Sequence, residues 1–92
     1  MKTERVRRLS EIAKHYGEEH QQQKAIEECA ELILAICKNK DKVGSVEDVV
    51  DEIADVEIML NQLKILFGCF CAVEDRIDFK IDRQLERIRK GE

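Results

Sequence analysis

Five carboxylate side chains stand in two short clusters, each inside an apolar stretch of the sequence. Residues 27–31 read Glu-Glu-Cys-Ala-Glu, and residues 52–55 read Glu-Ile-Ala-Asp. Like charges three or four residues apart on a helix repel one another, so an unliganded helix gains nothing from this arrangement. A divalent cation removes the repulsion, and a phosphate chain is the strongest reason for holding such a cation. The pattern therefore predicts a metal site that binds phosphate.

The ligand types indicate which cation to expect. Oxygen is almost the only donor within reach of the two clusters, and no Asp-rich calcium-loop motif occurs. Mg²⁺ and Mn²⁺ prefer carboxylate oxygens, and Mg²⁺ commonly shares its coordination shell with substrate phosphates. We expect Mg²⁺, or Mn²⁺ as a substitute, to be bound by Glu28, Glu31, Glu52 and Asp55. Glu27 is expected to bind a further ion or to orient a water molecule.

Helical geometry places these acids at the edges of apolar faces, because successive residues turn by about 100°. The second long helical segment is expected to bury an arc of Ile26, Cys29, Ala30, Leu32, Ile33, Ile36 and Cys37. The third is expected to bury Val49, Val50, Ile53, Val56, Leu60, Leu63 and Phe67. A stripe at its border carries Asp48, Glu52, Asp55, Met59 and Gln62.

The motifs and their flanks follow a definite order. Glu-Glu-x-x-Glu is followed, after residues 32–51, by Glu-x-x-Asp, and Gln21 and Lys24 precede the acidic pair as Gln-x-x-Lys-x-x-Glu-Glu. This order resembles the MazG-like all-α nucleoside triphosphate pyrophosphohydrolases, to which the dimeric all-α dUTPases are related. Residues 80–88, Lys-Ile-Asp-Arg-Gln-Leu-Glu-Arg-Ile, resemble the basic last helix of that family. The resemblance covers roughly residues 12–90.

The resemblance implies an enzyme that hydrolyses a nucleoside or deoxynucleoside triphosphate at the α-phosphorus, giving the monophosphate and pyrophosphate. Glu27 and Glu28 are the expected catalytic residues. The candidates for contacts with phosphate are Lys24, Lys80, Arg83 and Arg87, although for each single base in the last helix a solvated helix face is the slightly favoured interpretation. Gln21 and Asn61 are candidates for hydrogen bonds to the base or sugar. The aromatic residues available for stacking are Tyr16, Phe67, Phe70 and Phe79, and their spacing does not select among them.

Three other interpretations fit the same residues. The acidic clusters are the solvated face of a protein-interaction module, or they belong to a nucleotide sensor that binds metal and turns over poorly. Within the enzymes, a dUTPase or another base-specific relative is the alternative. Lys24 is the one base at helical spacing from Glu27 and Glu28, so the charge compensation is poor for a plain solvated face.

Composition predicts a single all-α domain over residues 1–92. The chain has no Pro, four Gly and 39% charged residues, and its net charge of −4 disfavours binding to nucleic-acid polymers. No apolar run is long enough for a membrane span, and no signal peptide is evident, so a cytoplasmic location is expected. The four cysteines lack zinc-site spacing and are interpreted as small buried residues in a reducing compartment.

The expected elements are helices over residues 3–16, 19–39, 46–67 and 73–90. Gly17 is expected to end the first helix in the left-handed conformation, and Ser45 with Asp48 resembles a capping box. A short turn joining two long helices predicts an antiparallel hairpin. The apolar arcs are wider than one partner helix covers, so we expect a homodimer or homotetramer built as a four-helix bundle, the assembly that the resemblance also implies.

Overall fold

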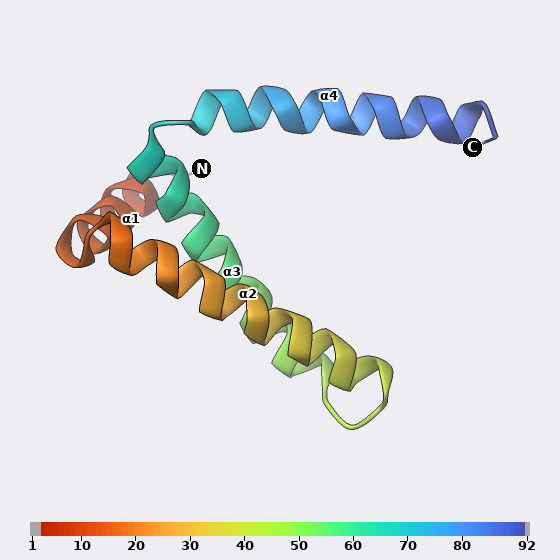
Figure 1. Cartoon of the computed structure of the whole chain (residues 1–92), viewed down its shortest axis with the longest axis horizontal. Helices are drawn as coiled ribbons and strands as arrows, with labels where there is room; N and C mark the ends of the chain where they lie inside the picture. The colour runs from red at the N-terminus through yellow and green to blue at the C-terminus, as the bar shows by residue number, and fades with distance from the viewer. Residues whose placement is uncertain (1–2, 92) are drawn as a thin grey trace.

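The chain forms four α-helices and no strand between residues 3 and 91, the part that the structure describes (Figure 1). In this computed structural model the helices are α1 (Thr3–Tyr16), α2 (Glu18–Lys40), α3 (Val46–Phe67) and α4 (Phe70–Arg89). The predicted all-α class with four helices is confirmed. The last helix begins at Phe70 rather than near residue 73.

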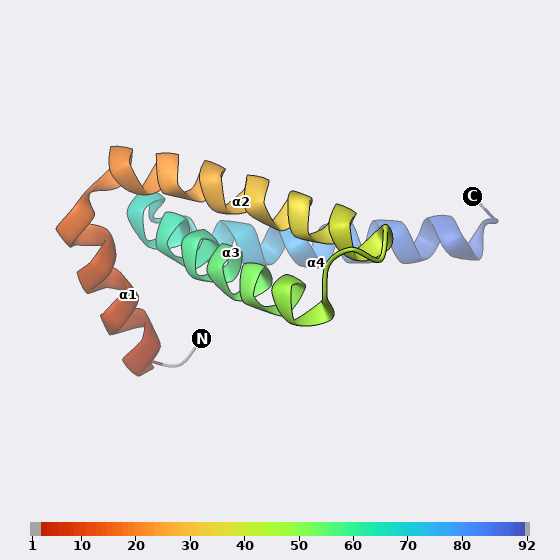
Figure 2. The same cartoon turned by 90° about the horizontal axis from the view of Figure 1, so that it is seen from below.

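The helices α2 and α3 form the body of the molecule and lie side by side (Figures 1 and 2). Residues 41–45 return the chain from one to the other, and α1 packs against both near the opposite end of the pair. Ser45 begins α3 with the predicted capping box. Its Oγ accepts a hydrogen bond from the Asp48 backbone N–H at 3.1 Å, and its own N–H donates to Asp48 Oδ2 at 3.3 Å.

Two glycines set the remaining helix ends. Gly68 follows α3 with φ 60° and ψ 38°, the left-handed conformation that commonly closes a helix. Gly17 ends α1 as predicted and has a positive φ of 90°, but its ψ of 162° differs from the αL conformation that was expected. It is the N-cap of α2, and α1 passes into α2 through this one residue. The tight corner places the Tyr16 ring against the His20 ring, with centroids 4.8 Å apart.

Small and polar side chains line the seam between α2 and α3. The buried residues of α2 are Gln21, Ala25, Glu28 and Ala35, and those of α3 are Val56, Met59 and Gln62. Alanines at the seam let the two backbones approach closely and leave room for the longer polar side chains. The helix faces that carry the acidic motifs therefore meet each other inside the chain.

The apolar faces that the sequence suggested as core point away from this seam. Of the residues expected to be buried, Val56 alone is fully buried, and the expectation for both helices is wrong for the single chain. The exposed members include Ile26, Ile33, Val50, Ile53, Leu60 and Phe67. Cys29, Cys37 and Cys71 are also exposed, which contradicts their interpretation as buried residues. Amphipathic periodicity finds the most apolar face of a helix, whereas here that face is left free.

The last helix, α4, extends away from the other three (Figure 1). Among residues 3–91 it packs only against α3, and the contact lies near its start. There the Lys64 ammonium lies 3.9 Å from the Glu74 carboxylate and 5.6 Å from the centre of the Phe70 ring. No residue of α4 is buried, so its apolar stripe is exposed. None of the helices in the described chain is both long and apolar enough to cross a membrane.

Candidate metal centre

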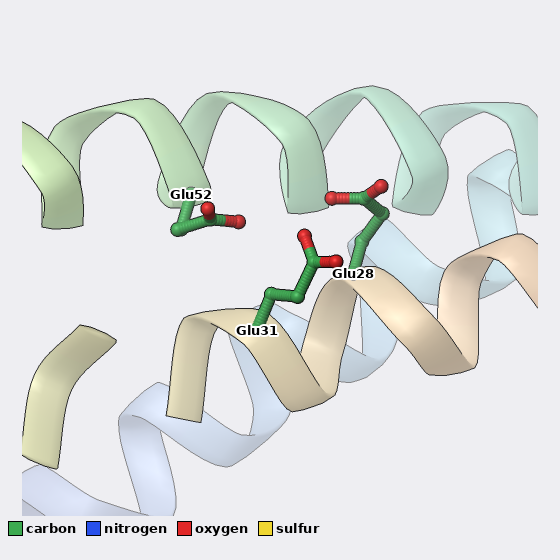
Figure 3. A group of neighbouring side chains, drawn as sticks. All are labelled: Glu28, Glu31 and Glu52. Atoms are coloured by element: carbon green, nitrogen blue, oxygen red, sulfur yellow. The ribbon is translucent and has the colours of Figure 1, made fainter. Parts of the chain in front are cut away.

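Three carboxylates from two helices meet at the α2–α3 seam (Figure 3). Glu28 and Glu31 project from successive turns of α2, and Glu52 projects toward them from α3. One oxygen of each lies within 4.8 Å of the others. Their spacing along each helix puts them on the seam face, and the side-by-side packing of α2 and α3 brings the two motifs together. Sequence reasoning predicted all three as metal ligands.

Burial distinguishes this cluster from an ordinary acidic surface. Glu28 is 7% exposed, Glu52 is half-buried and Glu31 is exposed. Glu28 Oε2 and Glu52 Oε2 are buried and have no hydrogen-bond partner in the structure. An ionised carboxylate oxygen out of water and without a donor is costly, so such atoms are normally paired or bound to a cation.

The charges of the cluster act on one another. Loss of water around Glu52 raises the pKa of its carboxyl above the ordinary value, and the negative charges of Glu31, Asp55 and Glu28 raise it further. Both causes favour the protonated form, because that form removes one like charge from a partly dry site. A bound cation would act in the opposite direction and favour the carboxylate.

Lys24 supplies the positive charge closest to the cluster. Its Nζ lies 3.2 Å from Glu28 Oε1, one turn along α2. The hydrogen bond to Glu28 raises the pKa of Lys24, and the charge of the same carboxylate adds to the effect. The lysine side chain is about half exposed, so its ammonium retains contact with solvent. It pairs with one oxygen of Glu28 and leaves the other unpartnered.

The cluster fits a hard divalent cation. All its donors are oxygens, which Mg²⁺, Mn²⁺ and Ca²⁺ prefer. Oxygens that share one Mg²⁺ lie about 3 to 4 Å apart, because each Mg–O distance is about 2.1 Å. The observed separations of up to 4.8 Å therefore need only small side-chain rotations to close around the ion. Three protein oxygens would leave coordination positions for water or phosphate.

A cleft of about 330 Å³ opens beside Glu31 and Glu52, toward the turn between α2 and α3. Its walls carry two acids and one base that we did not predict as site residues: Asp48, Asp51 and Lys38. Asp48 was visible in the acidic stripe of α3, four residues before Glu52, and Asp51 follows it by three. Only the fold shows that Lys38, from the last turn of α2, faces these acids across the cleft.

The other predicted site residues lie outside the cluster. Asp55 is exposed and affects Glu52 through its charge, while Glu27 is exposed on the side that faces α1. Gln21 is buried and donates a hydrogen bond to Gln62, and Asn61 is half-buried. The predicted bases Lys80, Arg83 and Arg87 are exposed on α4, which the single chain holds away from the seam.

Comparisons of the chain with protein-family models, curated proteins and solved structures found no match. The geometry of the carboxylate cluster and the order of the motifs in the sequence are therefore the two observations that bear on function.

Proposed function

We propose that this protein is a metal-dependent nucleoside triphosphate pyrophosphohydrolase, which releases the nucleoside monophosphate and pyrophosphate. The observation that carries the proposal is the pair of buried, unpartnered carboxylate oxygens on Glu28 and Glu52, together with Glu31 beside them. A divalent cation satisfies these oxygens, and a triphosphate is a ligand that such a cation would recruit. The motif order in the sequence adds the expectation that attack occurs at the α-phosphorus.

The acidic residues have different proposed roles in binding the cation and in positioning the attacking water. Glu28, Glu31 and Glu52 would hold the cation, and Asp55 is a candidate for a further ligand. When bound, Mg²⁺ would neutralise charge on the phosphates and on the leaving pyrophosphate. Glu27 lies outside the cluster on the side that faces α1, and it would orient the attacking water and accept its proton from there.

Lys24 is the base best placed for phosphate. Its ammonium has three N–H donors and one partner, Glu28 Oε1, so donors remain for a phosphate oxygen beside the cluster. The bases of α4 cannot contribute from their position in the single chain. We propose that Lys80, Arg83 and Arg87 approach phosphate only in an assembly of two or more chains.

A homodimer is the proposed assembly, and the exposed apolar surface supports it. An open apolar groove of about 590 Å³ runs along the outer side of α2 and α3, lined by residues such as Ile26, Ile33, Leu60, Leu63 and Phe67. Among residues 3–91 the single chain buries six apolar side chains, and three of them are alanines. So small a core leaves the chain dependent on further apolar burial, which a second copy supplies by covering the groove in a four-helix bundle.

The test is a screen for pyrophosphate release from all common ribo- and deoxyribonucleoside triphosphates, with Mg²⁺, with Mn²⁺ and with excess chelator. We expect release of pyrophosphate and monophosphate with either metal, and none with chelator. Glu52→Gln should lower kcat/KM by more than about 100-fold, because it removes a charge that holds the ion.

The matched control is Glu57→Gln, which neutralises an exposed acid one and a half turns further along α3 and should keep full activity. Hydrolysis that persists in chelator, or equal activity of Glu52→Gln and the parent, would contradict the proposal. Metal and triphosphate binding without products would indicate the sensor, and neither binding nor turnover would indicate an interaction module.

A further inference from the structure

A second hollow, separate from the acidic cleft, lies where α1 meets α2 and α3. It measures about 590 Å³, and its walls include Tyr16, His20, Gln21, Lys24, Met59 and Gln62. Lys24 links it to the carboxylate cluster, because the same ammonium lies 3.2 Å from Glu28. A nucleotide with its phosphates at the cluster would place its nucleoside in or near this hollow.

A chain of amide hydrogen bonds ends at the wall of the hollow. Gln21 Nε2 donates to Gln62 Oε1 at 2.6 Å, and His20 Nδ1 lies 2.7 Å from Gln21 Oε1, to which it donates in the tautomer that carries the proton on Nδ1. In that tautomer both amide oxygens accept from protein donors. The hydrogen-bonding groups that remain free in this network are amide N–H groups, which can donate to a ligand.

Gln62 holds the most poorly satisfied of these donors. The residue is 1% exposed, and within the described part of the chain its Nε2 donates only to the thioether sulfur of Met59, at 4.0 Å. A thioether is a weak acceptor, so a buried amide N–H that meets only sulfur lacks a proper partner. An oxygen acceptor on a ligand would supply one.

Other side chains around the hollow favour a flat ligand. The Tyr16 and His20 rings stack with centroids 4.8 Å apart and planes inclined by 16°, and Tyr16 is 54% exposed. Ile58 and Met59 add apolar surface. An exposed aromatic face beside apolar side chains binds nucleobases by stacking, with little dependence on which base is present.

We propose that this hollow binds the base of the nucleotide, and that Gln62 selects bases with a carbonyl oxygen by donating a hydrogen bond from Nε2. Uracil, thymine, cytosine and guanine present such a carbonyl, and adenine does not. Tyr16 supplies the stacking surface, and Gln21 and His20 hold the Gln62 amide in the donating orientation. This inference depends on the proposed function only in placing the phosphates at the carboxylate cluster.

The test is direct binding of nucleoside monophosphates, measured by calorimetry with Mg²⁺ present, so that it does not require turnover. The parent should bind uridine monophosphate at least about tenfold more tightly than adenosine monophosphate. Gln62→Met preserves the side-chain volume and removes the donor. It should lose most of that preference while keeping the same thermal stabilisation by Mg²⁺ alone.

Two further variants complete the design. Gln22→Met alters an exposed amide that donates to Glu18 on the helix surface, and it should keep the parent's preference. Tyr16→Leu changes an exposed ring without touching the buried residues, and it should weaken binding of every base by at least about fivefold.

The inference is overturned if Gln62→Met keeps the preference for uridine monophosphate, if Tyr16→Leu binds as the parent does, or if the parent binds no nucleoside monophosphate. These results are distinct from failure of the proposed hydrolysis. Base-selective binding without pyrophosphate release would contradict the proposed hydrolysis and support the base site. Hydrolysis with a base preference that Gln62→Met does not change would support the proposed hydrolysis and contradict the base site.

Discussion

Glu28 and Glu52 each bury a carboxylate oxygen that no hydrogen-bond donor reaches, one from each side of the α2–α3 seam. Lys24 pairs with the other oxygen of Glu28, and it is the one base among residues 3–91 that forms an ion pair with the cluster. Burying these like charges together is electrostatically unfavourable in the folded chain. For this reason the pKa of Glu52 is raised, and its carboxylate takes up a proton more readily than an ordinary glutamate. A divalent cation removes the same cost while leaving the carboxylates charged.

The raised pKa of Glu52 predicts how stability depends on pH without metal. Between the ordinary glutamate pKa and the raised one, the folded state binds more protons than the unfolded state, so the free energy of unfolding falls as pH rises. Glu52→Gln lacks this contribution and should show a flatter dependence from pH 4 upward. Urea unfolding of both proteins in chelator measures the difference. Identical pH dependence would show that Glu52 is well solvated.

Lys24→Met separates binding of metal from binding of phosphate. Removing the ammonium takes a positive charge from beside the proposed cation, so Mn²⁺ should bind several-fold more tightly to the protein alone. The KM for the triphosphate should rise about tenfold, because a charge-assisted contact with phosphate is lost. Metal titration and steady-state kinetics measure the two effects. Lys14→Met, at an exposed position of α1, should change neither, and a fall in both affinities would contradict the role given to Lys24.

At the scale of elements, α2 and α3 each have two distinct faces, one in the seam with the acidic and amide side chains and one that is apolar and exposed. The sequence pattern predicted the helices, the turn and the capping box correctly, because periodicity and local hydrogen bonding set them. It also predicted Glu28, Glu31 and Glu52 as metal ligands, and the fold brings these three carboxylates together. It did not predict that Gln21 and Gln62 pair inside the seam, or that Ile33 and Leu60 stay exposed. Which face of a helix meets which partner depends on packing between helices that lie far apart in sequence.

The capping box at Ser45 positions the start of α3, and through it Glu52. Ser45→Ala removes the acceptor for the Asp48 N–H and should destabilise the protein by about 1 kcal/mol. For a domain of this size, that corresponds to a fall of roughly 4–8 °C in the thermal midpoint, measurable by circular dichroism. Ser10→Ala, inside α1, is the control and should not lower it. Equal midpoints for Ser45→Ala and the parent would show that the cap adds little.

At the scale of the molecule, the single chain leaves much apolar surface uncovered. Its buried core is small, α4 extends without a covering partner, and an apolar groove lies open on α2 and α3. The proposed dimer would cover the groove with a second set of apolar faces and would give α4 a partner. The same association would offer the bases of α4 a route to a neighbouring site.

Sedimentation should therefore find a dimer or a larger assembly. Leu60→Asp places a charge in the apolar groove, at a side chain that is 44% exposed in the single chain, and should shift the protein to monomers. Leu60 is not among the buried residues of α3, so the helical content of the monomer should be largely retained. Val43→Asp, in the exposed turn, is the control. A parent that sediments as a stable monomer would show that one chain covers enough apolar surface by itself.

The central claim, that the seam between α2 and α3 holds a divalent cation, is tested most directly by titration with Mn²⁺. Paramagnetic resonance distinguishes free from bound ion, and the parent should show saturable binding that Mg²⁺ competes away. Glu28→Gln should lose most of this binding, because the buried unpartnered oxygen belongs to that side chain. Glu19→Gln, an exposed acid in the first turn of the same helix, should bind as the parent does. Absence of saturable binding in the parent, or equal binding by Glu28→Gln, would contradict the metal site.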